Sequence, residues 1–170
     1  MIIQLGSLLR GVLSKKAFVT AGEELAMLES YITIQQSRYK NRARFSVERE
    51  GCMEGYYVPK MILQPLVENA ISYGVDRSME VCQVRVRAVE QEEVLTFMVE
   101  DTGPGMVAQE LKKVRDGTCV PKGHGIGLQN IRERLALLSA DCRMTIDSTP
   151  GEGTKVCIRI PRIKEEPEHV

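Results

Sequence analysis

The chain contains no tryptophan, only two histidines and no excess of charge of either sign. Of its 170 residues, 5% are aromatic, and 23 lysines and arginines balance 23 aspartates and glutamates. A protein that binds nucleic acid usually carries a basic face, so this balance does not favour a nucleic-acid partner. Two histidines are also too few for a histidine-rich metal site.

Long apolar runs are absent as well. No stretch approaches the roughly 20 apolar residues that a membrane-spanning helix needs. The N-terminal residues are interrupted by Gln4, Ser7 and Arg10 and lack a basic leader, so no signal peptide is predicted there. We expect any contact with a membrane to come only through segments upstream of this chain.

Five cysteines are present, an odd number, and none is spaced as CxxC. This pattern predicts free thiols in a reducing compartment such as the cytoplasm, and it argues against a zinc site. With 43% hydrophobic and 27% charged residues, the composition is that of a globular protein. The length suffices for one domain with its own core, with or without a small appendage.

Apolar periodicity predicts helices and strands in mixed order. Helical spacing occurs in four segments, namely 1–40 with a break at 15–20, 59–73, 108–115 and 126–138. Alternation predicts five strands, at 45–50, 84–88, 94–100, 142–147 and 155–160. Because regular βαβ alternation is missing, we expect an α+β fold, a two-layer sandwich, rather than a doubly wound parallel sheet.

Two of the predicted helices carry positional signals. In the segment 1–40, Thr20 and Glu23 form a capping-box pattern, and the apolar stripe after it must pack on the domain itself or on another subunit. In the segment 59–73, Pro65 marks either the first turn or a kink. Gly74 is expected to end that helix.

Asn69 is the first candidate site residue. It shares one side of its predicted helix with Ile62, Leu66 and Tyr73. An asparagine that faces a core must find partners or lose roughly 1–3 kcal/mol. Its amide oxygen is a suitable Mg²⁺ ligand when phosphates and waters complete the octahedron. The alternative is an asparagine that is bonded to neighbouring backbone.

Asp101 follows a predicted strand and precedes Gly103 and Gly105. A carboxylate in this place can accept a hydrogen bond from an exocyclic amine such as that of adenine. The glycines let the backbone approach a flat ring without Cβ contacts. The alternative is a strand-end turn in which the aspartate bonds its own backbone.

A glycine cluster precedes the helix predicted at 126–138. Gly123, Gly125 and Gly127 place backbone N–H groups at a helix N-terminus, which favours an anion. The spacing is neither that of a Walker A loop nor that of a dinucleotide fingerprint. The mildly basic segment 106–123 fits a lid over phosphates. A flexible, solvated loop is the alternative for both features.

Taken together, these motifs resemble the ATP-binding domain of sensor histidine kinases, the Bergerat fold shared with gyrase, Hsp90 and MutL. LVENA resembles the N box, DTGPGM the G1 box, GHGIGL the G2 box, and residues 151–154 the closing G-T element, whose threonine helps to hold adenine through a water. The resemblance implies a mixed, largely antiparallel sheet covered by helices, and ATP with Mg²⁺ as cofactors. The residues that it implies for nucleotide binding are Asn69 (also the metal ligand), Asp101, Gly103, Gly105, Met106, Gly123, Gly125, Ile126, Gly127, Leu128 and Thr154.

The sequence of these motifs is most similar to that of the LytS/YehU-like subgroup of these kinases. The matching residues are Glu23 to Leu25, Tyr31, Ile34, Gln35, Arg38, Pro59, 63–71 and 127–135. The resemblance then implies three parts: a helical arm at 1–40 from the end of the dimerisation and phosphoacceptor region, an ATP-binding domain at 41–162, and a charged tail at 163–170. It also implies a homodimer when full length, with a response regulator as partner.

Three departures qualify the resemblance. No phosphoacceptor histidine is present, because His124 lies in the G2 box and His169 in the tail. We therefore expect the C-terminal part of a longer membrane-bound sensor, located in the cytoplasm, which transfers phosphate to a histidine outside this chain and does not autophosphorylate alone. Ser72 stands where the N box commonly has lysine. Pro65 stands where the ATPase branch places its water-activating glutamate, which argues for transfer rather than hydrolysis.

No catalytic residue is assigned on the chain itself. Three alternatives remain: a conformational ATPase of the gyrase, Hsp90 and MutL type, an anti-sigma-factor-like serine kinase, and a degenerate nucleotide-binding scaffold. The roles of Glu68, Arg132 and Arg134 are left open.

Overall fold

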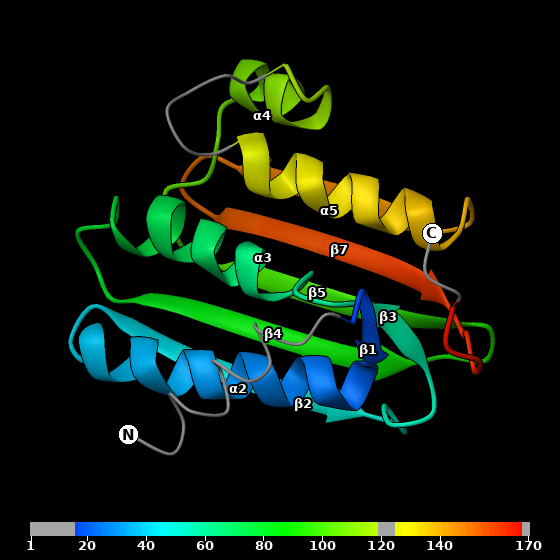
Figure 1. Cartoon of the computed structure of the whole chain (residues 1–170). Helices are drawn as coiled ribbons and strands as arrows, with labels where there is room; N and C mark the ends of the chain where they lie inside the picture. The colour runs from blue at the N-terminus through cyan, green and yellow to red at the C-terminus, as the bar shows by residue number, and fades with distance from the viewer. Residues whose placement is uncertain (1–15, 119–124, 168–170) are drawn as a thin grey trace.

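The structure of the chain, a computed structural model, describes residues 16–118 and 125–167. Its centre is a five-stranded sheet in the order β2-β4-β5-β7-β6, with helices over one face (Figure 1). The strands are β2 Ala43–Glu50, β4 Cys82–Glu90, β5 Val94–Asp101, β6 Arg143–Thr149 and β7 Gly153–Pro161. The β2–β4 pair is parallel and the other three pairs are antiparallel. This confirms the predicted α+β sandwich with a mixed, largely antiparallel sheet.

The helical layer and a small second sheet complete the described chain. The helices are α2 Ala21–Arg38, α3 Gln64–Asn69, the π-helix η1 Ala70–Val75, α4 Ala108–Arg115 and α5 Gly125–Leu138. The second sheet pairs β1 Phe18–Thr20 with β3 Tyr57–Pro59 in antiparallel fashion. Among the residues described, no helix is long and apolar enough to cross a membrane.

Helix α2 begins at the capping box that the sequence predicts. The Thr20 hydroxyl accepts a hydrogen bond from Glu23 N at 3.2 Å, and the Glu23 carboxylate accepts one from Thr20 N at 2.8 Å. Leu25, Leu28 and Ile32 are buried in the same core as the sheet. The described part of the predicted arm therefore packs on the domain itself. Residues 1–15, also predicted to be helical, lie outside the described residues.

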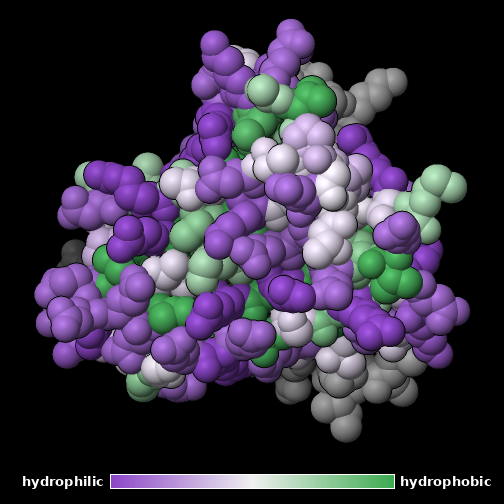
Figure 2. Space-filling view, turned by 180° about the vertical axis from the view of Figure 1, so that it is seen from behind, coloured by the Kyte–Doolittle hydropathy of each residue, from purple (hydrophilic) through white to green (hydrophobic). Residues whose placement is uncertain are grey.

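The two faces of the sheet differ in the way that strand alternation predicts. Val84, Val86 and Ala88 of β4 are fully buried beneath the helices. The alternate residues Gln83, Arg85 and Arg87 are exposed on the opposite face. Figure 2 shows the molecule from behind, where the surface is predominantly hydrophilic. Charged side chains on that face pair across strands, for example Lys155 Nζ with Glu100 Oε1 at 2.9 Å. The core thus lies on the helical side alone.

The predicted helix at 59–73 differs from the structure at both ends. It begins later, because 57–59 form a strand and Met61 adopts a positive φ of 57° that interrupts helical geometry. Pro65 lies in the first turn of α3, which is one of the two predicted options and a place where proline loses no helical bond. Gly74 does not end the helix, because η1 continues through it to Val75.

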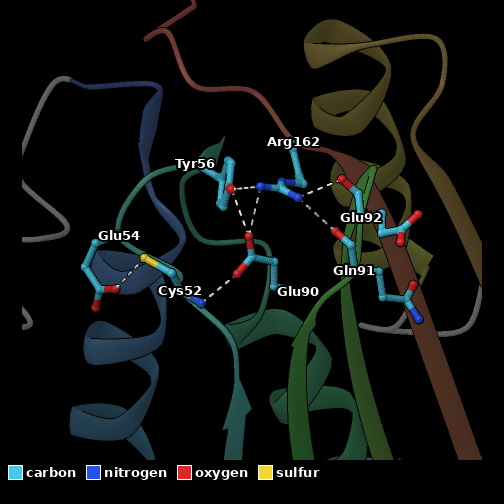
Figure 3. A network of polar contacts seen from close by, with 7 residues as sticks. All are labelled: Cys52, Glu54, Tyr56, Glu90, Gln91, Glu92 and Arg162. Atoms are coloured by element: carbon cyan, nitrogen blue, oxygen red, sulfur yellow. Dashed lines mark hydrogen bonds and ion pairs between the residues drawn. The ribbon is translucent and has the colours of Figure 1, made fainter.

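At one end of the sheet, a polar network fastens three segments together (Figure 3). The Glu90 carboxylate accepts hydrogen bonds from Cys52 N at 2.8 Å and Tyr56 Oη at 2.8 Å, and it pairs with Arg162 at 3.1 Å. Arg162 also donates to Tyr56 Oη and, at 2.6 Å, to the carbonyl of Glu92. We call these five residues the clamp. It joins the loop before β3, the β4–β5 turn and the segment that follows β7.

The described cysteines are free thiols, as their number and spacing predict. They are Cys52, Cys82, Cys142 and Cys157.

Candidate functional site

A pocket lies between the helical layer and the β5–β7–β6 part of the sheet, and it encloses about 900 Å³ when its open mouth is included. Five of the residues singled out from the sequence line it together: Asn69, Asp101, Met106, Leu128 and Thr154. The structure therefore brings together side chains that are up to 85 positions apart in the chain, given by 154 − 69.

Asp101 is placed in the wall by the end of β5. It is 7% exposed, and its Oδ1 accepts a hydrogen bond from Gly103 N at 2.9 Å. Desolvation raises the pKa of Asp101 to about 6, against the opposing effect of backbone hydrogen bonds from Gly103 and Thr154. The carboxylate is thus ionised at neutral pH in surroundings that solvate it poorly. An acceptor in this state favours a ligand that brings a hydrogen-bond donor.

The glycines near Asp101 shape the wall rather than line the pocket. A Cβ on Gly103 would lie 2.2 Å from the Cα of Gly74, and a Cβ on Gly74 would lie 2.7 Å from Asp101 Oδ1. Gly105 has a φ of 64°, and a Cβ there would meet the carbonyl of Thr149 at 2.0 Å. Only glycine fits these three positions, so η1 and the turn after β5 can close directly on Asp101.

Ser148 is a site residue that the sequence argument missed. Its Oγ accepts a hydrogen bond from Met106 N at 2.9 Å, donates to the carbonyl of Gly153 at 2.8 Å and lies 3.0 Å from Thr154 Oγ1. A hydroxyl has a single proton to donate, so the Thr154 hydroxyl donates to Ser148. The hydroxyl of Thr154 is thereby oriented beside Asp101. The direct pairing of Ser148 with Thr154 across the β6–β7 hairpin is the signal that could have revealed it.

Asn69 is the last residue of α3, and it lies on the wall of the pocket opposite Asp101. Its Nδ2 is buried and has no hydrogen-bond partner. Such a group loses the hydration it had in the unfolded chain, at a cost of about 1–3 kcal/mol, unless a ligand restores a partner. Rotation about the Cβ–Cγ bond presents either the amide nitrogen or the amide oxygen to the pocket. The unpartnered amide therefore fits a ligand that includes phosphate oxygens and a hard cation.

The predicted glycine-rich segment is only partly described. Residues 119–124, which include Gly123 and the end of the predicted lid 106–123, lie outside the described residues. Gly125 and Ile126 belong to the first turn of α5. A Cβ on Gly127 would lie 3.8 Å from the Cβ of Pro65, and Leu128 is buried against the pocket. The first turn of an α-helix leaves N–H groups free for an anion, and here that turn is adjacent to Leu128.

Several pocket residues were not assigned from the sequence. Tyr73 lies one helical turn beyond Asn69, and the guanidinium of Arg77 sits over its ring at 4.5 Å. Glu110 on α4 and Arg132 on α5 also line the pocket, and Arg132 Nη2 donates to the carbonyl of Val114 at 3.2 Å. Their contribution depends on how α4 and α5 pack, which local patterns do not reveal.

The fold and pocket define an ATP-binding module of the kind that histidine kinases share with gyrase and Hsp90. Residues 58–164 match the model of the family described as histidine kinase-, DNA gyrase B-, and HSP90-like ATPase, and residues 1–43 match a histidine kinase model. The chain belongs to the former family, and within it corresponds to the ATP-binding catalytic domain of sensor histidine kinases. Nucleotide binding follows from that membership.

Named relatives agree with this assignment. The chain is 36% identical over 163 residues to the sensor histidine kinase YesM of Bacillus subtilis, covering 95% of this chain and 27% of the relative. It is 30% identical to the sensor protein LytS of Bacillus anthracis, covering 92% and 27%, and 30% identical to the sensor protein kinase HptS of Staphylococcus aureus, covering 93% and 31%. The chain thus spans about a quarter to a third of these relatives.

Solved structures support the fold alone, because their sequences are distant. The catalytic domain of the histidine kinase ThkA superposes with a TM-score of 0.65 at 17% identity, over 89% of this chain and all of that one. A mycobacterial sensor histidine kinase, MprB, gives a TM-score of 0.63 at 18% identity, over 87% of this chain and 98% of that one.

Proposed function

We propose that this chain binds ATP with Mg²⁺ and serves the transfer of the γ-phosphoryl group to a histidine that lies outside it. The main observation that supports this proposal is that one pocket holds two groups in need of a partner. They are Asp101, an ionised and poorly solvated acceptor, and Asn69, an unpartnered amide. A nucleotide supplies what each of them needs, namely an exocyclic amine and a metal-bound phosphate group.

The residues divide the ligand between them. Asp101, with the Thr154 hydroxyl that Ser148 orients, would receive the adenine, and Met106 and Leu128 provide apolar contact beside it. Asn69 would hold Mg²⁺ through its amide oxygen, and the first turn of α5 would receive phosphate oxygens. When bound, Mg²⁺ neutralises phosphate charge. Phosphoryl transfer depends mainly on such positioning and charge neutralisation, so no nucleophile is needed on this chain.

Transfer is favoured over a conformational ATPase by the surroundings of Asn69. A water-activating carboxylate would stand four residues earlier, where this chain has Pro65. The one acidic residue of α3 is Glu68, which is exposed and accepts a hydrogen bond from Gln64 at 2.8 Å. Glu68 is not among the residues that line the pocket. No carboxylate of this helix therefore faces the position of the phosphates.

The names of the relatives, which are sensor kinases, support a proposal about the wider setting. We propose that the chain works in the cytoplasm as part of a longer, membrane-bound homodimer, and that its phosphate reaches a response regulator. The predicted division at residues 40 and 162 belongs to the same proposal. An anti-sigma-factor-like serine kinase is disfavoured by the match of residues 1–43 to a histidine kinase model.

Calorimetric titration with a non-hydrolysable ATP analogue and Mg²⁺ tests the proposal. We expect binding in the micromolar to sub-millimolar range, lost in Asp101→Asn and retained in Asp141→Asn, which makes the same change at an exposed aspartate. Absence of binding by the unaltered chain would overturn the proposed function. Unchanged binding by Asp101→Asn would overturn the role of Asp101.

A further inference from the structure

One buried carboxylate has no part in the proposed function. Glu24, in the first turn of α2, is 2% exposed. Its Oε1 accepts hydrogen bonds from Ile62 N at 2.8 Å and Leu63 N at 3.0 Å, and its Oε2 accepts one from Met61 N at 2.8 Å. Three charge-assisted bonds from consecutive amides offset part of the loss of water around the carboxylate, while burial still raises the pKa of Glu24. Glu24 therefore fixes the backbone at 61–63.

The same short loop is held from two further sides. Lys60 N donates to the carbonyl of Ala17 at 2.9 Å, immediately before β1. Arg134 of α5 donates through Nη1 to the carbonyls of Lys60 at 2.7 Å and Met61 at 3.4 Å. Met61 keeps a positive φ that is unfavourable for its side chain, so the loop retains this conformation because its surroundings impose it.

The loop leads directly into the helix that carries Asn69. Leu63 is the N-cap residue of α3, and this helix has no hydrogen bond from a capping side chain of its own. Glu24 supplies anchoring from another element instead. Asn69 follows Leu63 by six residues, which is about 9 Å along a helix. Because α3 is short, a shift of its first turn is carried to Asn69.

We propose that Glu24 is a positioning residue for the nucleotide site. It fixes the start of α3, and through α3 the Asn69 amide, and it thereby connects the first turn of α2 to the end of the pocket at which Asn69 lies. This inference rests on the proposed function. It predicts a selective defect, because Asp101 and Thr154 stand on β5 and β7, whereas Glu24 accepts its hydrogen bonds from residues 61–63 in the loop before α3.

Glu24→Gln is the decisive variant, since glutamine keeps the size of the side chain but has one acceptor oxygen for three donors. Outer partners of metal-binding residues typically contribute 10- to 100-fold to affinity. We expect the affinity for the ATP analogue with Mg²⁺ to fall at least about tenfold, and the affinity without Mg²⁺ to change less than about threefold. The ¹⁵N–¹H signals of the Asn69 side chain should shift in the same variant.

Glu23→Gln is the matched control. It makes the same chemical change one position earlier, where the carboxylate caps α2 and is exposed. We expect it to lower the unfolding temperature while both affinities and the Asn69 signals stay unchanged. If Glu24→Gln behaves like this control, or weakens binding equally with and without Mg²⁺, the positioning role is overturned. Failure of the unaltered chain to bind would instead reject the proposed function.

Arg134→Gln keeps the inference testable if Glu24→Gln does not fold. This variant leaves Glu24 in place and removes the second attachment of the loop. We expect a loss of about threefold in Arg134→Gln alone, again only with Mg²⁺. Where Glu24→Gln does fold, the loss in the double variant should be smaller than the product of the two single losses. Unchanged Mg²⁺-dependent affinity in Arg134→Gln would contradict the proposal.

Discussion

The pocket and the clamp differ in whether their carboxylate and amide groups find partners within the protein. In the clamp, Glu90 is surrounded by donors, and hydrogen bonds from Cys52 N and Tyr56 together with the charge of Arg162 lower its pKa. In the pocket, desolvation raises the pKa of Asp101, and Asn69 keeps an unpartnered amide. A region whose polar groups are all satisfied contributes to stability. A region that leaves them unsatisfied holds them for a ligand, at the expense of stability.

The largest expected effect comes from Asp101→Asn. Loss of the adenine acceptor should weaken nucleotide binding about 100-fold or more, whereas a neutral isostere should remove the cost of burying charge. Since the pKa of Asp101 is raised from 3.8 to about 6, the folded state binds its proton more tightly than the unfolded state. This contribution to the free energy of unfolding is therefore largest below pH 4 and is lost as the pH rises to 6.

Chemical denaturation at several pH values between 4 and 8 measures this contribution of Asp101 to the free energy of unfolding. At pH 7 we expect Asp101→Asn to be more stable than the unaltered chain by about 2 kcal/mol. The two proteins should converge near pH 4. A variant that is less stable at pH 7 would show that Asp101 serves mainly as a structural acceptor for Gly103 and Thr154.

The next effect is expected at the contact between η1 and the turn after β5. In Gly103→Ala, the new methyl group would overlap Gly74, so the wall must move. Overpacking of this kind costs about 1–3 kcal/mol, and the displaced Asp101 should also weaken nucleotide binding. Gly55→Ala is the control, because a Cβ there meets nothing within 4 Å. Equal stability of the two variants would contradict the close contact.

A smaller effect is expected from Ser148→Ala. The change leaves Met106 N without its acceptor and frees the Thr154 hydroxyl, at a cost of about 1–2 kcal/mol. Nucleotide affinity should fall severalfold, since the hydroxyl beside Asp101 is no longer oriented. Ser46→Ala, at an exposed position on β2, should change neither quantity. Denaturation and titration of both variants provide the comparison.

At the clamp we expect no effect on nucleotide binding, which makes this the smallest effect of the series. Glu90→Gln should lower the unfolding temperature by a few degrees while nucleotide affinity stays constant. Because the pKa of Glu90 is lowered, its contribution is present at neutral pH and is lost as the pH falls below about 4.5. Glu92→Gln is the control, since only the carbonyl of Glu92 takes part. If Glu90→Gln changed the affinity for nucleotide, the clamp and the pocket would be coupled, which would contradict the contrast between them.

Sequence patterns predicted those parts of the fold that repeat over a whole element. Helix α4 lies at 108–115 as expected, and β4 buries the alternate positions that its pattern assigns to the core. The β1–β3 pair was missed, because each strand has three residues and no period can be measured over that length. The π-helical turn through Gly74 also escaped prediction, and Gly74 lies close to Asp101, which is distant in the sequence.

The candidate site was predicted to a similar degree. The motif residues Asn69, Asp101 and Thr154 line one pocket, as the order of the motifs suggested. Their binding roles remain predictions until a nucleotide is titrated. Arg132 was not assigned, because its contact with Val114 joins two separate helices. Ser148 was missed although its partner Thr154 faces it across the same hairpin.

The ends of the described chain leave the domain at one corner. Tyr57 N donates to the carbonyl of Ile163, Lys60 N donates to that of Ala17, and Lys16 pairs with Glu166 at 3.6 Å. Both ends are therefore attached beside the loop that leads to α3. A pair of fluorophores at positions 16 and 166 would report changes in the distance between the two ends of the described chain. Such labels would leave the nucleotide pocket itself unlabelled.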